Sequence, residues 1–126
     1  MAKIYLLLAA VSGLLAVVIG AFGAHGLKGS VSAQSLATFQ TGVQYQFFHT
    51  LALLAVTLFM VQMDSASRWL SATASCWLLG MLLFSGSLYW LALGGPRWLG
   101  PVTPLGGLLL MAGWLCLALG AIRLRL

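Results

Sequence analysis

The chain has 126 residues, of which 62% are hydrophobic and only 6% are charged, and its mean hydropathy is +1.07. A soluble domain carries about a quarter charged residues, so this composition excludes a soluble fold and indicates an integral membrane protein. The net charge of +5 comes from basic residues scattered singly, which excludes the clustered basic patch of a nucleic-acid-binding protein.

The first predicted element is a membrane-spanning helix over residues 4–24. Lys3 and the apolar run behind it are also typical of a signal peptide. The run is longer than the roughly 7 to 15 apolar residues of a signal peptide's core. We therefore expect a retained first span.

Residues 33–46 are predicted to form a short amphipathic helix on the outer membrane interface, before a second span over residues 47–63. Ser32 is a favourable N-cap residue, and Gly42 is where we expect the chain to bend into the membrane. The helical spacing is carried by Leu36, Phe39, Val43 and Phe47 on one face, and by Gln40 and Gln44 on another. The alternative is one long second helix with a polar entrance.

The third and fourth spans are predicted over residues 69–93 and 104–122. Glycine and proline residues separate them, and a helix would not cross such a segment. Residues 64–68, which include the single acid Asp64, form the short connection between the second and third spans. The expected fold is an all-α bundle of four transmembrane helices, forming a single membrane domain over residues 1–126.

An even number of spans places both termini on one side of the membrane. That side carries Lys3, Arg68, Arg123 and Arg125, and the opposite side carries Lys28 and Arg97. Because lysine and arginine are enriched in cytoplasmic segments, we expect both termini in the cytoplasm.

Small residues recur at helical spacing along three of the predicted spans. The glycines of these seams are Gly13, Gly20, Gly80, Gly106, Gly113 and Gly120. Small residues permit close approach of helices in lipid, so the seams predict helix packing within the chain or contacts between subunits. Cys76 and Cys116 lie in apolar segments and have the spacing of neither a zinc site nor a secreted disulfide framework. We expect free, buried thiols.

Polar side chains are predicted to gather at one depth, in the outer half of the spans. The candidate ligand-binding residues are His25, Gln40, Gln44, Tyr45, His49, Ser85, Ser87 and Tyr89. Polar groups inside a membrane are costly unless satisfied, and they often mark a function. Three interpretations remain open: a structural hydrogen-bond network, a site for a small ligand or lipid headgroup, and a weaker metal or haem site at His25 and His49.

The residues that are missing limit the chemistry. No carboxylate lies in a predicted span, so a carboxylate-coupled transporter lacks its coupling group. Asp64 is predicted on the opposite side from both histidines, and no acid–base pair or nucleophile constellation is visible. We therefore do not expect the protein to be an enzyme. An enzyme acting on a lipid or quinone is the least supported hypothesis. The sequence identifies no cofactor.

Several motifs carry a resemblance to a known family. They are GAFGAHG over residues 20–26, FQTGVQYQFFHT over 39–50, FSGSLY over 84–89, TPLGG over 103–107 and GW over 113–114. Together they resemble the YgdD/YwdK family of small bacterial inner-membrane proteins, a domain of unknown function. The resemblance implies a four-span inner-membrane protein and carries over no catalytic residue.

Two functions are expected from the sequence. The first is a structural or interaction protein that assembles with itself or with a larger membrane complex. The alternative is a ligand-, lipid- or metal-binding or transport module that uses an outer-facing polar site around His25 and His49. In both, the bilayer is the main partner.

Overall fold

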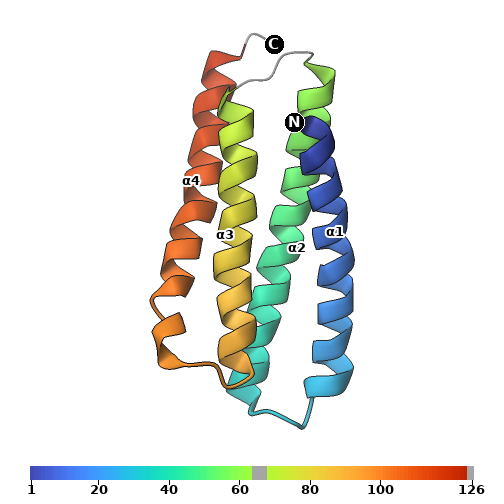
Figure 1. Ribbon diagram of the computed structural model, residues 1–126, viewed down its shortest axis with the longest axis vertical. Helices are drawn as coiled ribbons and strands as arrows, with labels where there is room; N and C mark the ends of the chain where they lie inside the picture. The colour runs from blue at the N-terminus through green and yellow to red at the C-terminus, as the bar shows by residue number, and fades with distance from the viewer. Residues whose placement is uncertain (64–67, 125–126) are drawn as a thin grey trace.

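A computed structural model describes residues 1–63 and 68–124. The elements are α1 (Ala2–Phe22), the π-helical turn η1 (Gly23–Leu27), α2 (Ala33–Gln62), α3 (Arg68–Ala92), the 3-10 turn η2 (Arg97–Leu99) and α4 (Val102–Arg123). Within the described residues, four helical segments are long and apolar enough to cross a membrane. The predicted all-α, four-helix architecture is confirmed (Figure 1).

The second helix differs from the prediction. Residues 33–46 do not form a separate interfacial helix, because α2 runs without interruption from Ala33 to Gln62. Ser32 caps it, and its side chain accepts a hydrogen bond of 3.0 Å from the Ser35 amide. The helix continues through Gly42, and the ring of Tyr89 packs into the space that a Cβ there would need. The predicted connection at Asp64, Ser65 and Ser67, like Arg125, lies outside the described residues.

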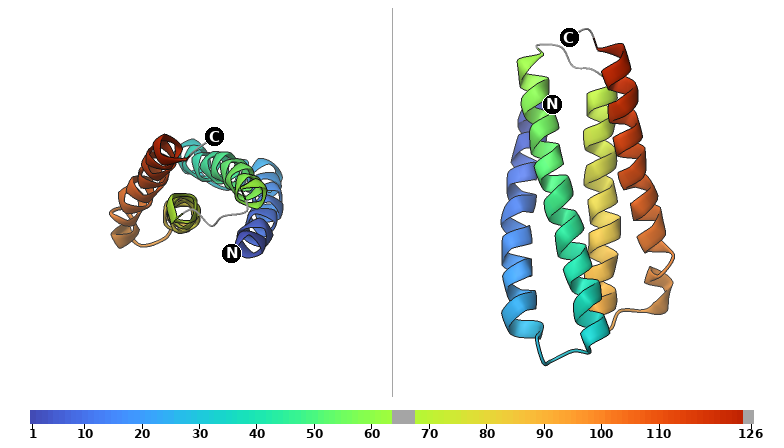
Figure 2. Two further views of the ribbon diagram at one scale, coloured as in Figure 1. Left: turned by 90° about the horizontal axis from the view of Figure 1, so that it is seen from above. Right: turned by 180° about the vertical axis from the view of Figure 1, so that it is seen from behind.

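The helices pack in chain order, α1 on α2, α2 on α3 and α3 on α4. Seen from above in Figure 2, α4 and α1 lie at opposite ends of the arrangement, with α2 and α3 between them. Both chain ends lie at the same end of the molecule (Figure 1). Tyr5 joins α1 to α3 near this end, since its hydroxyl lies 2.9 Å from Ser75 Oγ.

Glycines set the distance between α3 and α4. A Cβ on Gly106 would meet the backbone of Phe84, and one on Gly113 would meet the ring of Trp77. The same α3–α4 seam includes Gly80, which lies against Leu110, and Gly120, which lies against Trp69. At Gly106 the helix backbones themselves approach each other, and at the other three glycines a side chain of the neighbouring helix fills the space left by the missing Cβ.

The glycines of α1 face α2. A Cβ on Gly20 would lie 3.2 Å from Val43, and one on Gly13 would lie 3.6 Å from Thr50. All the glycines predicted to mediate packing therefore lie against a neighbouring helix of the same chain.

Candidate functional site

The candidate site is built around Gln46, a polar residue of α2 that is only 7% exposed. Its Nε2 donates a hydrogen bond of 3.0 Å to the backbone oxygen of Ser12 in α1. Its Oε1 accepts a hydrogen bond of 2.5 Å from the hydroxyl of Tyr89 in α3. A carbonyl oxygen can only accept, so the Ser12 carbonyl fixes which side of the amide faces α1. Gln46 thus connects three helices.

A chain of hydroxyl groups extends from Gln46 toward the middle of the molecule. Ser12 Oγ lies 2.7 Å from Thr50 Oγ1, and Thr50 Oγ1 donates to the sulfur of Met81 at 3.6 Å. Since a hydroxyl has one hydrogen to donate, Ser12 is the donor to Thr50. We call Ser12, Gln46, Thr50 and Tyr89 the Gln46 cluster.

Ser85 lies one helical turn before Tyr89 on α3. The hydroxyl of Ser85 donates a hydrogen bond of 2.7 Å to the backbone oxygen of Gly42. The Gly42 carbonyl oxygen can accept one hydrogen bond within its own helix. The hydrogen of Ser85 therefore uses the second lone pair of that carbonyl oxygen. This bond ties α3 to α2 beside the Gln46 cluster.

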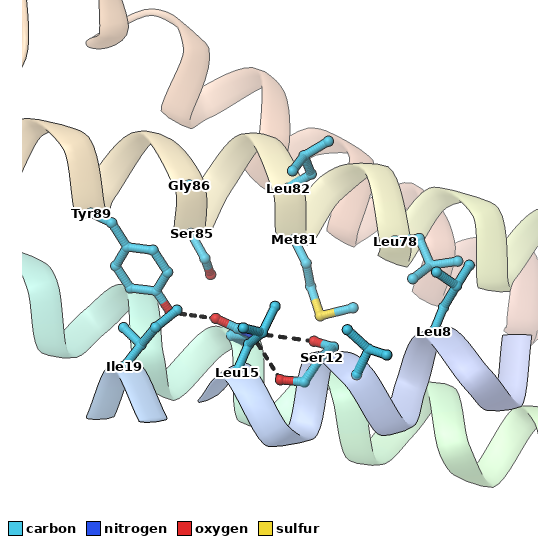
Figure 3. Close-up of a pocket in the computed structure, with 12 residues that line it drawn as sticks. Leu8, Ser12, Leu15, Ile19, Leu78, Met81, Leu82, Ser85, Gly86 and Tyr89 are labelled. Atoms are coloured by element: carbon cyan, nitrogen blue, oxygen red, sulfur yellow. Dashed lines mark hydrogen bonds between the residues drawn. The ribbon is translucent and has the colours of Figure 1, made fainter. Parts of the chain in front are cut away.

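A groove of about 320 Å³ opens beside these residues, between α1 and α3 and over α2. We call it the α1–α3 groove. It is lined by Leu8, Val11, Ser12, Leu15, Ile19, Gln46, Leu78, Met81, Leu82, Ser85, Gly86 and Tyr89. Figure 3 shows Ser85 and Tyr89 pointing from α3 toward Ser12, Leu15 and Ile19 of α1. The walls are mainly apolar, and the polar side chains of the lining are those of Ser12, Gln46, Ser85 and Tyr89.

His49 lies on a different side of α2 and forms a second polar contact. Its Nε2 accepts a hydrogen bond of 3.0 Å from the indole nitrogen of Trp114 in α4. Its Nδ1 lies 2.9 Å from the backbone oxygen of Tyr45 and donates to it. The ring packs edge-on against Trp77, with centroids 6.0 Å apart. Both ring nitrogens are engaged, so His49 holds α2 against α4 and offers no free nitrogen to a metal.

His25 and His49 are not brought together. Gly23 packs on Phe39 and Gly13 on Thr50, so α1 and α2 run antiparallel and His49 is level with Gly13. His25 lies in the exposed turn η1, about twelve residues further along, which corresponds to about 18 Å of helix. The predicted single depth for the two histidines is therefore incorrect. Among residues 1–63 and 68–124, no group of three or more histidine, cysteine, aspartate or glutamate side chains could hold a metal.

The other predicted site residues lie in three different places. Tyr89 and Ser85 line the α1–α3 groove. Gln40, Gln44 and Tyr45 are exposed on α2 away from the groove, although the Tyr45 ring packs on Phe84 with centroids 4.8 Å apart. Ser87 instead bonds Thr103 at 2.6 Å, joining α3 to α4.

Sequence reasoning did not select Ser12, Gln46 or Thr50 as site residues. A signal was present, because Gly42, Gln46 and Thr50 recur at steps of four and share one face of a helix. The predicted break near Gly42 hid this pattern by assigning Gly42 and Gln46 to an interfacial helix. Within the described residues, every buried side-chain nitrogen and oxygen has a hydrogen-bond partner.

Comparisons with known proteins agree with the fold. Residues 19–107 match the family described as "Protein of unknown function (DUF423)". The chain belongs to this family. A "UPF0382 membrane protein" of Haemophilus influenzae is 44% identical over 119 residues, which cover 94% of this chain and 94% of the relative.

Two further relatives bear the names expected from the motifs. The "UPF0382 inner membrane protein YgdD" of Escherichia coli is 44% identical over 123 residues, covering 98% of this chain and 92% of the relative. The "UPF0382 membrane protein YwdK" of Bacillus subtilis is 41% identical over 123 residues, covering 96% and 98%. The predicted resemblance is confirmed, and the DUF423 family is one of membrane proteins. No solved structure matches the chain.

Proposed function

We propose that the protein is a membrane-embedded binding module that holds one single-chain, lipid-like molecule in the α1–α3 groove. The observation that carries this proposal is the position of Gln46, Ser85 and Tyr89 in the lining of a groove that is otherwise apolar. Ligand sites are typically apolar cavities with a few polar groups that fix orientation. The polar end of the ligand contacts these residues, and its apolar chain lies along α1 and α3.

The size of the groove limits the occupant. Its volume of about 320 Å³ is at the lower end of the roughly 300 to 1,000 Å³ found for ligand sites. One acyl or isoprenoid chain with a small polar end fits such a space better than a whole phospholipid does.

The groove is reached from the side. Leu8 and Leu15 of α1 are 40% and 46% exposed, and Leu82 of α3 is 69% exposed. These residues border the groove on helices that are apolar enough to cross the bilayer. An apolar molecule enters between them directly from the hydrocarbon core, without passing through water.

A filled groove tests the proposal. A Cβ on Gly86 meets no atom within 4 Å, so Gly86→Leu places a side chain in the groove without displacing a helix. The control is Ala118→Leu, which adds the same side chain at an exposed position of α4. We expect native mass spectrometry and lipid extraction to find a bound apolar molecule with the unmodified protein and with Ala118→Leu, and to find it lost with Gly86→Leu. Equal retention by both variants would contradict the proposal.

A second candidate function is assembly with another copy of the chain through α1. Its outward stripe of Ile4, Leu7, Val11, Leu14 and Val18 is 46–65% exposed, and Val11 also borders the α1–α3 groove. These residues follow each other at steps of three and four, as in a heptad repeat. The β-branched residues Ile4, Val11 and Val18 occupy one heptad position, and Leu7 and Leu14 occupy the other. This pattern favours parallel two-stranded packing, which a two-fold axis along the membrane normal would produce.

Cysteine cross-linking tests this second candidate. In a background in which Cys76 and Cys116 are replaced by serine, Leu14→Cys places a thiol on the outward stripe of α1. Val17→Cys is the matched control, because Val17 is 57% exposed but lies off the stripe. We expect a disulfide-linked dimer in oxidised membranes with Leu14→Cys and much less with Val17→Cys. Equal yields from the two positions would count against an α1 interface.

A further inference from the structure

We propose that the α1–α3 groove selects a molecule whose polar end is a neutral hydroxyl, and that Ser85 and Tyr89 accept its hydrogen. This inference rests on the proposed function, since it names the chemistry of the same ligand. The reason is that the polar side chains of the groove already donate their hydrogens to other protein atoms but can still accept one.

The donors that face the groove are already in use. Gln46 Nε2 donates to the backbone oxygen of Ser12 at 3.0 Å and lies 3.4 Å from Ser12 Oγ, so its amide group has two acceptors on α1. The single hydrogens of Ser85 and Tyr89 go to the Gly42 carbonyl and to Gln46 Oε1. The hydrogen of Ser12 goes to Thr50, which itself donates to Met81.

The hydroxyl oxygens of Ser85 and Tyr89 can still accept a hydrogen bond. A hydroxyl oxygen that donates its hydrogen still has two lone pairs. Ser85 Oγ and Tyr89 Oη both belong to the groove lining and come from adjacent turns of α3. A ligand that brings a hydrogen to this point gains a bond without breaking one inside the protein.

The available lone pairs discriminate among membrane molecules. An ester, ether or ketone can only accept, so it would find no free donor at the Gln46 cluster and would leave its own oxygen unsatisfied. An ammonium group could donate, but a charge at this depth is costly because no carboxylate lies in any span to balance it. A neutral hydroxyl at the end of one apolar chain, as in a long-chain or isoprenoid alcohol, satisfies both conditions.

Two probes of equal length test the inference. The unmodified protein in a mild detergent is titrated with 1-dodecanol and with its methyl ether, and binding of each is followed by native mass spectrometry. We expect the alcohol to bind about two- to tenfold more tightly, which is the effect of one net hydrogen bond. Equal affinities for the two probes would overturn the hydroxyl preference and leave the groove as an unselective apolar site. Binding of neither probe would overturn the proposed function itself.

A variant locates the preference. Ser85→Ala removes one acceptor and frees none in the groove lining, because its hydrogen-bond partner Gly42 does not line the groove. We therefore expect affinity for the alcohol to fall toward that for the ether, while affinity for the ether stays unchanged. Binding of the ether shows in the same experiment that the groove is still formed. A preference for the alcohol that is as strong in Ser85→Ala as in the unmodified protein would assign the acceptor elsewhere and overturn the inference.

Discussion

The hydroxyl of Tyr89 donates a hydrogen bond of 2.5 Å to Oε1 of Gln46, across 43 residues of sequence. Through the same amide, Gln46 also reaches the backbone of Ser12. Apolar area contributes little to helix association in lipid, where close packing and interhelical hydrogen bonds remain. The Gln46 cluster is therefore a main attachment of α1 to the rest of the chain.

Removing the Tyr89 hydroxyl tests this attachment. We expect Tyr89→Phe to lower the free energy of unfolding by about 1 to 2 kcal/mol, because Gln46 Oε1 loses its donor in a buried position. The measurement is thermal or denaturant unfolding in detergent. Tyr45→Phe is the control, since Tyr45 is 39% exposed. Similar losses from the two substitutions would show that the Tyr89–Gln46 bond has no special role.

Two adjacent glycines of α4 give a matched pair for the helix seam. A Cβ on Gly106 would overlap the backbone of Phe84, whereas one on Gly107 would lie 3.7 Å from the Phe84 ring. We expect Gly106→Ala to lower stability by about 1 to 3 kcal/mol, because α3 and α4 must separate. Gly107→Ala should leave the melting temperature unchanged or raise it slightly, as alanine favours a helix. The reverse order of melting temperatures would contradict the packing of α3 on α4.

The contact between His49 and Trp114 predicts an energetic coupling. His49→Ala should destabilise the protein, because a buried ring between two tryptophans is lost. A double-mutant cycle with Trp114→Phe should give a coupling of about 0.6 kcal/mol, the usual size for a hydrogen bond within a membrane. The control cycle pairs His49→Ala with Trp98→Phe and should be additive. Additivity in both cycles would remove His49 from the α2–α4 contact.

The two cysteines provide a covalent test of the α3–α4 register. Cys76 in α3 and Cys116 in α4 are both free thiols, and their side chains lie close to each other across the two helices. Mild oxidation of membranes should therefore form a disulfide between them. Trypsin cleavage after the exposed Arg97 then leaves peptides 69–97 and 98–123 joined until a reductant is added. Cys116→Ser should give separate peptides, and separate peptides from the oxidised unmodified protein would contradict the register.

The orientation of the chain is a prediction that reporter fusions can check. Lys3, Arg68 and Arg123 lie at the end of the molecule that carries the termini, and Lys28 and Arg97 lie in the turns at the other end. We expect a fluorescent protein fused to the C-terminus to be bright and alkaline phosphatase fused at the same point to be inactive, as in the cytoplasm. Active phosphatase at the C-terminus would reverse the orientation.

The sequence alone determined the solvent, the number of helices and their approximate ends. These properties depend on local composition, such as the apolar run over residues 4–24 and the Gly94-Gly95-Pro96 turn, and each helix satisfies its own backbone. The exception was the predicted separate helix over residues 33–46. Glycine lowers helix propensity locally, but α2 continues through Gly42, against which the ring of Tyr89 packs.

Only the tertiary structure decided which polar residues meet. Ser85 and Tyr89 could be selected as polar residues of a span. Their partners in α2, the Gly42 carbonyl for Ser85 and Gln46 for Tyr89, lie more than thirty residues away in the chain. Likewise, His25 and His49 could be paired in sequence but are separated by about twelve residues of antiparallel helix. The composition of a segment determines how favourably that helix enters the bilayer. A site depends instead on how neighbouring helices are rotated and aligned, because its residues come from different helices. That arrangement is set by contacts between residues distant in the chain.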